Sequence, residues 1–228
     1  MQPDGLIKKE ILEDLQNKRS LAIKIILPLL LISPIAFSKT DVLVKAGVIL
    51  GFVIFFGIFG SSVGFVRLKE TKMMERMAVL PIPYWRLTLD YIVANTILDV
   101  GQIVLPFILI VFNARLSMKD LALSVVALLA SVLVANTLGV LVGFLAKTSG
   151  EVHLYSIISV LLTVLLSGAI SFIPIPTVIT WFFPFDEFFL TFIGKGGNTL
   201  VILVLSVIPC FIWLGFAMFA SKKIWIFS

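Results

Sequence analysis

Six long apolar runs dominate the chain, and its polar residues gather in the segments between them. The runs cover approximately residues 21–37, 46–66, 88–112, 121–145, 154–173 and 199–220. A helix needs about 20 mostly apolar residues to cross the hydrocarbon core of a bilayer. Because lipid offers the backbone no hydrogen-bond partners, runs of this length predict transmembrane helices. The pattern predicts an all-α membrane protein with six transmembrane helices in a single domain over residues 1–228.

The N-terminal segment 4–19 has a different pattern. Ile7, Ile11 and Leu15 recur at helical spacing, and charged residues occupy most of the other positions. Such a segment is too polar to span a bilayer but has one apolar face. Because it leads directly into the first apolar run, we expect an amphipathic helix in the membrane interface. A helix that packs on a soluble partner is the alternative.

Composition and charge narrow the class of protein. Hydrophobic residues make up 60% of the chain and charged residues 14%, whereas a soluble domain has about half and a quarter. This balance excludes a soluble enzyme, a disordered chain and a large domain outside the membrane. The net charge of +5 fits basic loops beside anionic membrane lipids, so we expect no nucleic-acid partner.

The positions of the basic residues predict the orientation. With the N-terminus inside, 13 of the 18 Lys and Arg residues fall on the cytoplasmic side and five on the outer side. Cytoplasmic loops carry the excess of Lys and Arg in membrane proteins. We therefore expect a multi-pass protein of the cell membrane with both termini in the cytoplasm.

The cytoplasmic loop 67–86 is longer than a connection requires. It has about 20 residues, whereas a simple connection takes about 4–6. Met73, Met77 and Leu80 lie at helical spacing, and a proline pair then ends the helix. The pattern favours a short docking helix with an adaptable methionine face. A solvated loop that only joins two spans is the alternative.

Residues 70–91 resemble the cytoplasmic loop of ABC transporter permeases of the type-two exporter class. That loop runs from Glu through Gly-Thr and Leu-Glu to Pro-Ile-Ser and an aromatic or basic residue. The matching positions here are Glu70, Met74-Glu75, Leu80-Pro81-Ile82 and Arg86. Lys72 and Met73 stand in place of Gly-Thr, and Pro83 in place of Ser. The layout of interfacial helix, six spans and an outer segment between spans five and six is also similar.

The resemblance implies a permease subunit of an ATP-driven exporter. In such permeases this loop is a coupling helix seated on a separate ABC ATPase subunit, and two permeases pair, here as a homodimer. The ATPase subunit holds ATP and Mg²⁺, and this chain, which lacks a G-x-x-x-x-G-K-[ST] phosphate loop, holds no cofactor and is not itself an enzyme. We expect no catalytic residues and no metal site. The residues expected to contact the ATPase are Glu70, Met73, Met74, Glu75, Arg76, Met77, Pro81, Pro83 and Arg86.

Span three carries a line of polar residues. Tyr91, Asn95, Asp99 and Gln102 follow helical spacing on one face. A carboxylate at mid-membrane costs several kcal/mol unless it is paired, hydrated or protonated. One hypothesis places Asn95, Asp99 and Gln102 in a wet translocation pathway. The other ties Asp99 to Asn136 or Thr137 of span four by hydrogen bonds.

The outer segment 174–198 is rich in both proline and phenylalanine. Prolines at 174, 176 and 184 break it too often for a span, yet it is too apolar for an ordinary loop. We expect short helices that dip into the membrane and form an apolar plug at the outer end of the pathway. The plug residues are Phe182, Phe183, Pro184, Phe185 and Phe188.

Glycines spaced by four residues suggest close helix packing. The pairs are Gly47 with Gly51, Gly60 with Gly64, and Gly139 with Gly143. Small residues at this spacing let two membrane helices approach closely, either within one protomer or between two.

An ATP-independent channel or carrier that uses Asp99 for ion or proton coupling remains the alternative function. A non-transporting scaffold or sensor subunit is a further one.

Overall fold

The computed structural model describes residues 18–74, 82–114, 116–166, 181–195 and 197–227 of the chain. All seven described elements are α-helices, which confirms the all-α class over this part of the chain. They are α2 (Lys18–Phe37), α3 (Val42–Glu70), α5 (Tyr84–Ala114), α6 (Met118–Leu145), α7 (Ser149–Leu166), α9 (Phe185–Phe192) and α10 (Thr199–Phe227). The predicted interfacial helix 4–19 lies outside the described residues except for its last two positions.

Five of the described helices are long and apolar enough to cross a membrane: α3, α5, α6, α7 and α10. Each corresponds to one of the six predicted spans, although α7 starts five residues earlier than expected, at Ser149. The remaining predicted span, 21–37, coincides with α2, whose 20 residues include the apolar stretch Ile26–Phe37. The protein is therefore a multi-pass membrane protein, and the count of six spans stays a prediction.

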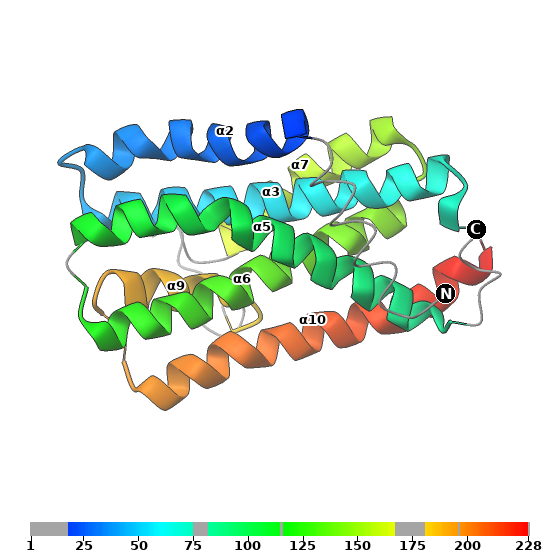
Figure 1. The fold of residues 1–228 in the computed structure, drawn as a ribbon. Helices are drawn as coiled ribbons and strands as arrows, with labels where there is room; N and C mark the ends of the chain where they lie inside the picture. Colours follow the sequence, from blue (N-terminus) through cyan, green and yellow to red (C-terminus); the bar gives the residue numbers. More distant parts are fainter. Residues whose placement is uncertain (1–17, 75–81, 115, 167–180, 196, 228) are drawn as a thin grey trace.

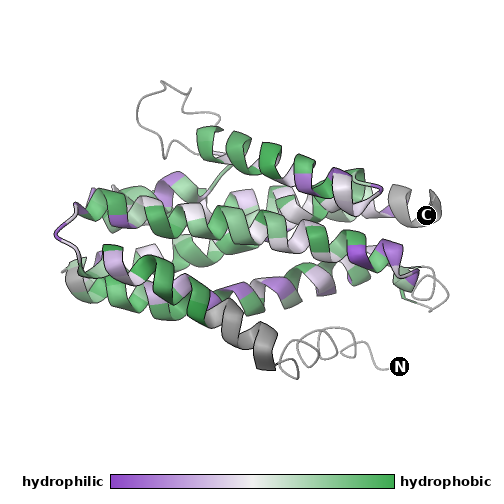
Figure 2. Ribbon diagram, turned by 90° about the horizontal axis from the view of Figure 1, so that it is seen from above, coloured by the Kyte–Doolittle hydropathy of each residue, from purple (hydrophilic) through white to green (hydrophobic). Residues whose placement is uncertain are grey.

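The long helices run lengthwise through one bundle, and the short α9 lies beside α6 near one end (Figure 1). We call this end of the bundle the α9 end. The opposite end, where α3 ends and α5 and α7 begin, is the loop end. Hydrophobic residues cover most of the length of the helices, and hydrophilic ones lie near the turns and at some positions inside the bundle (Figure 2).

The closest packing in the bundle joins α3 to α6, and glycines make it possible. A Cβ atom at Gly139 would lie 2.6 Å from the carbonyl oxygen of Ile58, and one at Gly57 would lie 2.7 Å from the Cβ of Ala135. The helices can approach this closely only because these positions lack side chains. In contrast, a Cβ at Gly47 or Gly51 would meet nothing within 4 Å. The Gly139 motif therefore packs the protomer internally.

Candidate functional site

The predicted polar face of span three lies on α5, and its residue Asp99 contacts α6. The Asn136 Nδ2 donates a hydrogen bond to Asp99 Oδ2 at 2.8 Å and another to the carbonyl oxygen of Val132 at 3.0 Å. The Asn136 Oδ1 accepts a hydrogen bond from Ser61 of α3. Asn136 is fully buried and Asp99 is half-buried. One side-chain amide thus joins α3, α5 and α6.

Two other residues of this face, Asn95 and Gln102, bond within α5, whereas the hydroxyl of Tyr91 donates to the carbonyl oxygen of Ser61 in α3 at 3.2 Å. Asn95 Nδ2 donates to the carbonyl oxygen of Tyr91 at 2.9 Å, one turn back on the same helix. The Gln102 amide lies 3.5 Å from Asp99 Oδ1, which makes a weak hydrogen bond at best. Thr137 donates to the backbone of its own helix at Leu133. Of the two partners predicted for Asp99, the structure selects Asn136.

Ser61 is the member of this network that the sequence analysis missed. A serine beside the glycines of a membrane helix gives a weak signal, because such serines often bond to their own backbone, as the neighbouring Ser62 does to Phe59. Its pairing with Asn136 depends on the rotation of α3 against α6, which the glycines permit but the sequence does not reveal.

A small hollow adjoins the carboxylate of Asp99. It lies between α3 and α5, where Asp99 and Gln102 meet the stacked rings of Phe52 and Phe56. Its volume is about 10 Å³, approximately the space of one water molecule. The carboxylate can therefore bind one water there, but the hollow is too small to be a continuous wet pathway.

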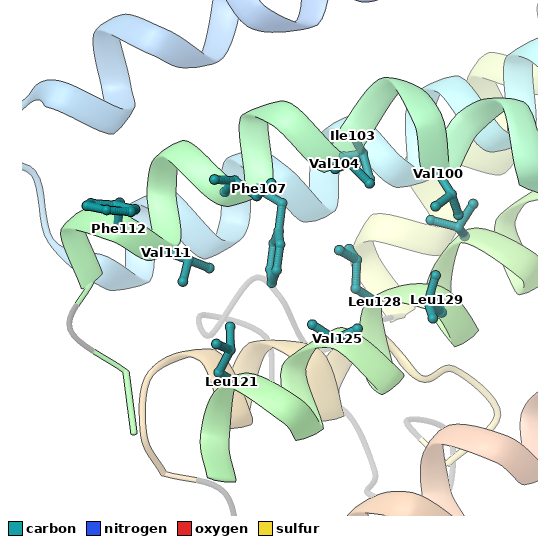
Figure 3. Close-up of a pocket in the computed structure, with 12 residues that line it drawn as sticks. Val100, Ile103, Val104, Phe107, Val111, Phe112, Leu121, Val125, Leu128 and Leu129 are labelled. Atoms are coloured by element: carbon teal, nitrogen blue, oxygen red, sulfur yellow. The ribbon is translucent and has the colours of Figure 1, made fainter. Parts of the chain in front are cut away.

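A larger cavity of about 360 Å³ opens between α5 and α6 toward the α9 end (Figure 3). At its inner limit Val100 and Val132 lie next to the Asp99–Asn136 hydrogen bond in the two helices. Every lining side chain is apolar, so the walls suit hydrocarbon and offer no side chain to hold a polar ligand. The lining residues are Val100, Ile103, Val104, Phe107, Ile108, Val111, Phe112, Leu121, Val125, Leu128, Leu129 and Val132.

The predicted plug residues fall on and just before α9. Phe185 and Phe188 are fully buried and pack inside the protomer, and Phe183 is 8% exposed. The ring of Phe188 lies 6.4 Å, centroid to centroid, from that of Phe107, which lines the cavity. Pro184 directly precedes the helix and is also buried. These rings form part of the protomer's own core at the α9 end.

Phe182 differs from the other plug residues because its side chain is 44% exposed. Its backbone carbonyl accepts a hydrogen bond from Trp213 Nε1 at 2.9 Å, which ties the segment before α9 to α10. Only this ring of the predicted plug faces away from the core. The plug role itself stays a prediction.

Two carboxyl groups open the first turn of α9, which is not one of the spanning helices. Burial raises the pKa of Glu187 to about 7, and the neighbouring Asp186 adds to the rise. Burial also raises the pKa of Asp186. A raised pKa means that the folded protein binds the proton more tightly than the unfolded chain. The contribution of Glu187 to stability is therefore largest below its ordinary pKa of 4.5 and is lost as the pH rises toward 7.

The predicted coupling residues are only partly within the described structure. Met74 is 2% exposed and packs among Phe65, Leu87 and Tyr91 of the protomer, so its side chain is not free to fill a groove on another subunit in this structure. Met73 is half-buried at the edge of the same cluster.

The remaining predicted coupling residues divide into two groups. Glu70 and Pro83 are exposed and Arg86 is half-buried at the loop end. The other four lie outside the described residues: Glu75, Arg76, Met77 and Pro81. Among the described residues no cluster of three metal-ligating side chains is present.

Residues 5–194 match the family model described as ABC-2 type transporter. No curated protein matches the chain in sequence. The matched range contains every residue assigned above to the polar face, the coupling loop and the plug.

Proposed function

The chain belongs to the ABC-2 type transporter membrane family and is thus a transmembrane permease subunit of an ABC transporter, and we propose that it serves an ATP-driven exporter. The family match over residues 5–194 is the observation that carries this proposal. A separate ABC ATPase subunit would bind ATP and Mg²⁺ and supply the hydrolysis, so the chain itself would not be an enzyme. The pathway would form in the cell membrane, between two copies of the permease.

The proposed mechanism is a rigid-body movement. Closure of the ATPase subunits would push the loop 67–86 and the N-terminal segment 4–19 from the cytoplasmic side. The long helices would then tilt and open the pathway outward. The tight packing of α3 on α6 supports this, because packed helices move together rather than deform. Both termini would lie in the cytoplasm, as the distribution of Lys and Arg predicts.

Purification of the chain from its native membrane tests the partner directly. We expect an ABC ATPase subunit, recognisable by its phosphate-binding loop, to co-purify in stoichiometric amount. A chain that purifies alone and conducts ions or protons in vesicles without ATP would overturn the exporter and support the channel or carrier.

Charge reversal in the coupling loop should uncouple hydrolysis from transport. The double variant Glu75→Lys with Arg76→Glu reverses the sign of both charges and leaves the net charge of the loop unchanged. We expect the variant to insert and to lose most of the ATPase stimulation that the wild-type complex shows when substrates are screened. Lys119→Glu, an exposed charge at the α9 end, is the matched control. Unchanged stimulation of the ATPase activity in the double variant would show that these two residues do not contribute to docking.

The contacts of Asp99 favour a structural role over ion coupling. Asparagine at this position keeps an oxygen that accepts the hydrogen bond from Asn136, so Asp99→Asn should leave thermal stability and transport nearly unchanged. Asp99→Leu removes the acceptor and should lower the free energy of unfolding by about 1 kcal/mol. Thermal unfolding in detergent measures both effects.

A change in transport or in its pH profile in Asp99→Asn, without loss of stability, would support the carrier instead. Accessibility gives a second test. In a background with Cys210 replaced, a cysteine at position 99 should resist a small water-soluble maleimide in every state of the ATPase.

A further inference from the structure

The last turn of α3 carries a lysine that holds the end of α6. The Lys69 Nζ donates hydrogen bonds to the carbonyl oxygens of Gly143 at 2.7 Å, Phe144 at 3.0 Å and Ala146 at 3.0 Å. The last carbonyls of a helix have no partner within it, and they form the negative end of its dipole. The three donors of one ammonium group thus satisfy three carbonyls around the end of α6, where the charge is most favourable.

The next residue holds the start of α7. Glu70 Oε1 accepts a hydrogen bond from the backbone N–H of Ser149 at 2.8 Å. Ser149 is the first residue of α7, so its N–H belongs to the positive end of that helix. The local cap of α7 uses other groups: Thr148 Oγ1 accepts from the N–H of Glu151 at 3.3 Å, and Glu151 Oε2 accepts from the N–H of Lys147 at 2.8 Å. Glu70 therefore takes an amide that this local cap leaves open.

Lys69 and Glu70 thus contact the two ends of the turn between α6 and α7. The positive charge lies at the end of α6 and the negative charge at the start of α7, which is the favourable arrangement for both helix dipoles. The chain turns away immediately afterwards, since Thr71 ends α3 and Lys72 has a φ of +54°. We name this pair of contacts the Lys69–Glu70 clamp. It stands at the point where α3 passes into the coupling loop.

We propose that the Lys69–Glu70 clamp is the positioning element that transmits movement of the coupling loop to α6 and α7. This rests on the proposed function, because it requires an ATPase that moves the loop. It also gives Glu70 a task other than contact with the ATPase. A shift of the end of α3 would carry with it both the end of α6 and the start of α7.

The packing of α7 shows why such a clamp matters. Of its 18 residues only Val152, Ser156 and Thr163 are buried, and it contacts mainly α3, with a smaller contact to α6. Besides the clamp, one side-chain hydrogen bond joins it to α3, between Ser156 and Ser62 at 2.6 Å. The rings of Phe59 and His153 also stack between α3 and α7, at 5.3 Å between centroids, so the polar attachments position α7 together with this contact. The clamp is the attachment nearest the loop.

The experiment uses the full permease with its co-purified ATPase in lipid nanodiscs, with Cys210→Ser as background. Spin labels replace two exposed side chains, Leu154 of α7 and Phe216 of α10, and the distance between them is measured with and without trapped ATP. We expect ATP to change this distance in the parent protein. In Lys69→Met with Glu70→Met, which removes both the donor and the acceptor, the change should fall to less than half.

Arg67→Met is the matched control, because Arg67 is an exposed basic residue in the same turn of α3. The charge exchange Lys69→Glu with Glu70→Lys is a second variant: it keeps the composition but places each charge at the wrong helix end. It should lose the ATP-driven change at least as fully as the first variant.

Hydrogen exchange at the first turn of α7 separates the clamp from the proposed function, since it needs no ATPase. Glu70→Met, which removes the accepting oxygen, should raise exchange at the Ser149 amide by about tenfold, and Arg67→Met should not. Unchanged exchange would show that the clamp does not hold α7. If the clamp variants show faster exchange but keep the full ATP-driven distance change, the contact is only structural. Unchanged exchange and an unchanged distance response each overturn the proposal. A parent complex that shows no ATP-driven change would instead overturn the proposed function, and the transmission role with it.

Discussion

Gly139→Ala is expected to destabilise the bundle by about 3 kcal/mol, the upper end of the range for overpacking. The added methyl group would lie 2.6 Å and 2.8 Å from the carbonyl oxygens of Ile58 and Gly57, and 2.9 Å from the Cβ of Ser61. Two of these three atoms are backbone, so relief requires α3 and α6 to separate. Separation would also weaken the hydrogen bond from Ser61 to Asn136. Thermal or denaturant unfolding in detergent measures the loss.

Gly51→Ala is the control for this prediction. It belongs to a motif of the same spacing, and its Cβ would meet nothing within 4 Å. Because alanine favours the helix over glycine by about 0.5–1 kcal/mol, this variant should be neutral or slightly more stable. Equal destabilisation by the two substitutions would show that close packing of α3 on α6 does not depend on Gly139. Loss of dimer in Gly51→Ala without loss of stability would assign that glycine to contact between protomers.

The glycine motifs show which features of the fold the sequence could predict and which it could not. Apolar runs of about 20 residues located all six long helices that the structure describes, because the bilayer requires that length whatever the neighbours are. The same spacing of glycines, however, occurs in a motif that packs tightly and in one that faces open space. The difference arises from how each helix is rotated in the bundle, and that depends on all the other helices together.

At the candidate site, too, the contacts between helices could not be predicted from the sequence. Spacing placed Asn95, Asp99 and Gln102 on one face of a helix, but it left two partners for Asp99, and only contact with α6 selected Asn136. Glu70 was expected to contact the ATPase subunit. In the structure its carboxylate accepts a hydrogen bond from the backbone N–H of Ser149, the first residue of α7. Contacts between side chains of one helix follow from periodicity. Contacts between helices require the rotation and height of both.

Phe188→Ala is expected to lower the free energy of unfolding by about 2–3 kcal/mol. Buried Phe→Ala substitutions cost about 3–5 kcal/mol in soluble proteins, where transfer from water and loss of packing both contribute. In a bilayer the transfer part shrinks, because lipid is as apolar as the core, so mainly the packing loss remains. The ring of Phe188 is fully buried, with Phe192 at 5.5 Å and Phe107 at 6.4 Å between centroids. Phe107 also lines the 360 Å³ cavity, so little material is available to fill the new space.

Phe182→Ala provides the comparison, since its ring is 44% exposed and its hydrogen bond to Trp213 uses the backbone, which the substitution keeps. It should change stability by less than about 0.5 kcal/mol, as expected for a surface position.

Phe188→Leu keeps more of the packing, so the fold survives in a variant that still lacks the ring. If the segment around α9 also works as a plug, Phe188→Leu should raise the basal ATPase rate or the leak of the complex while Phe182→Ala does not. A destabilised Phe188→Ala beside a tight, normally regulated Phe188→Leu would assign this ring to the core alone. Similar stability of Phe188→Ala and Phe182→Ala would contradict the placement of α9 inside the protomer.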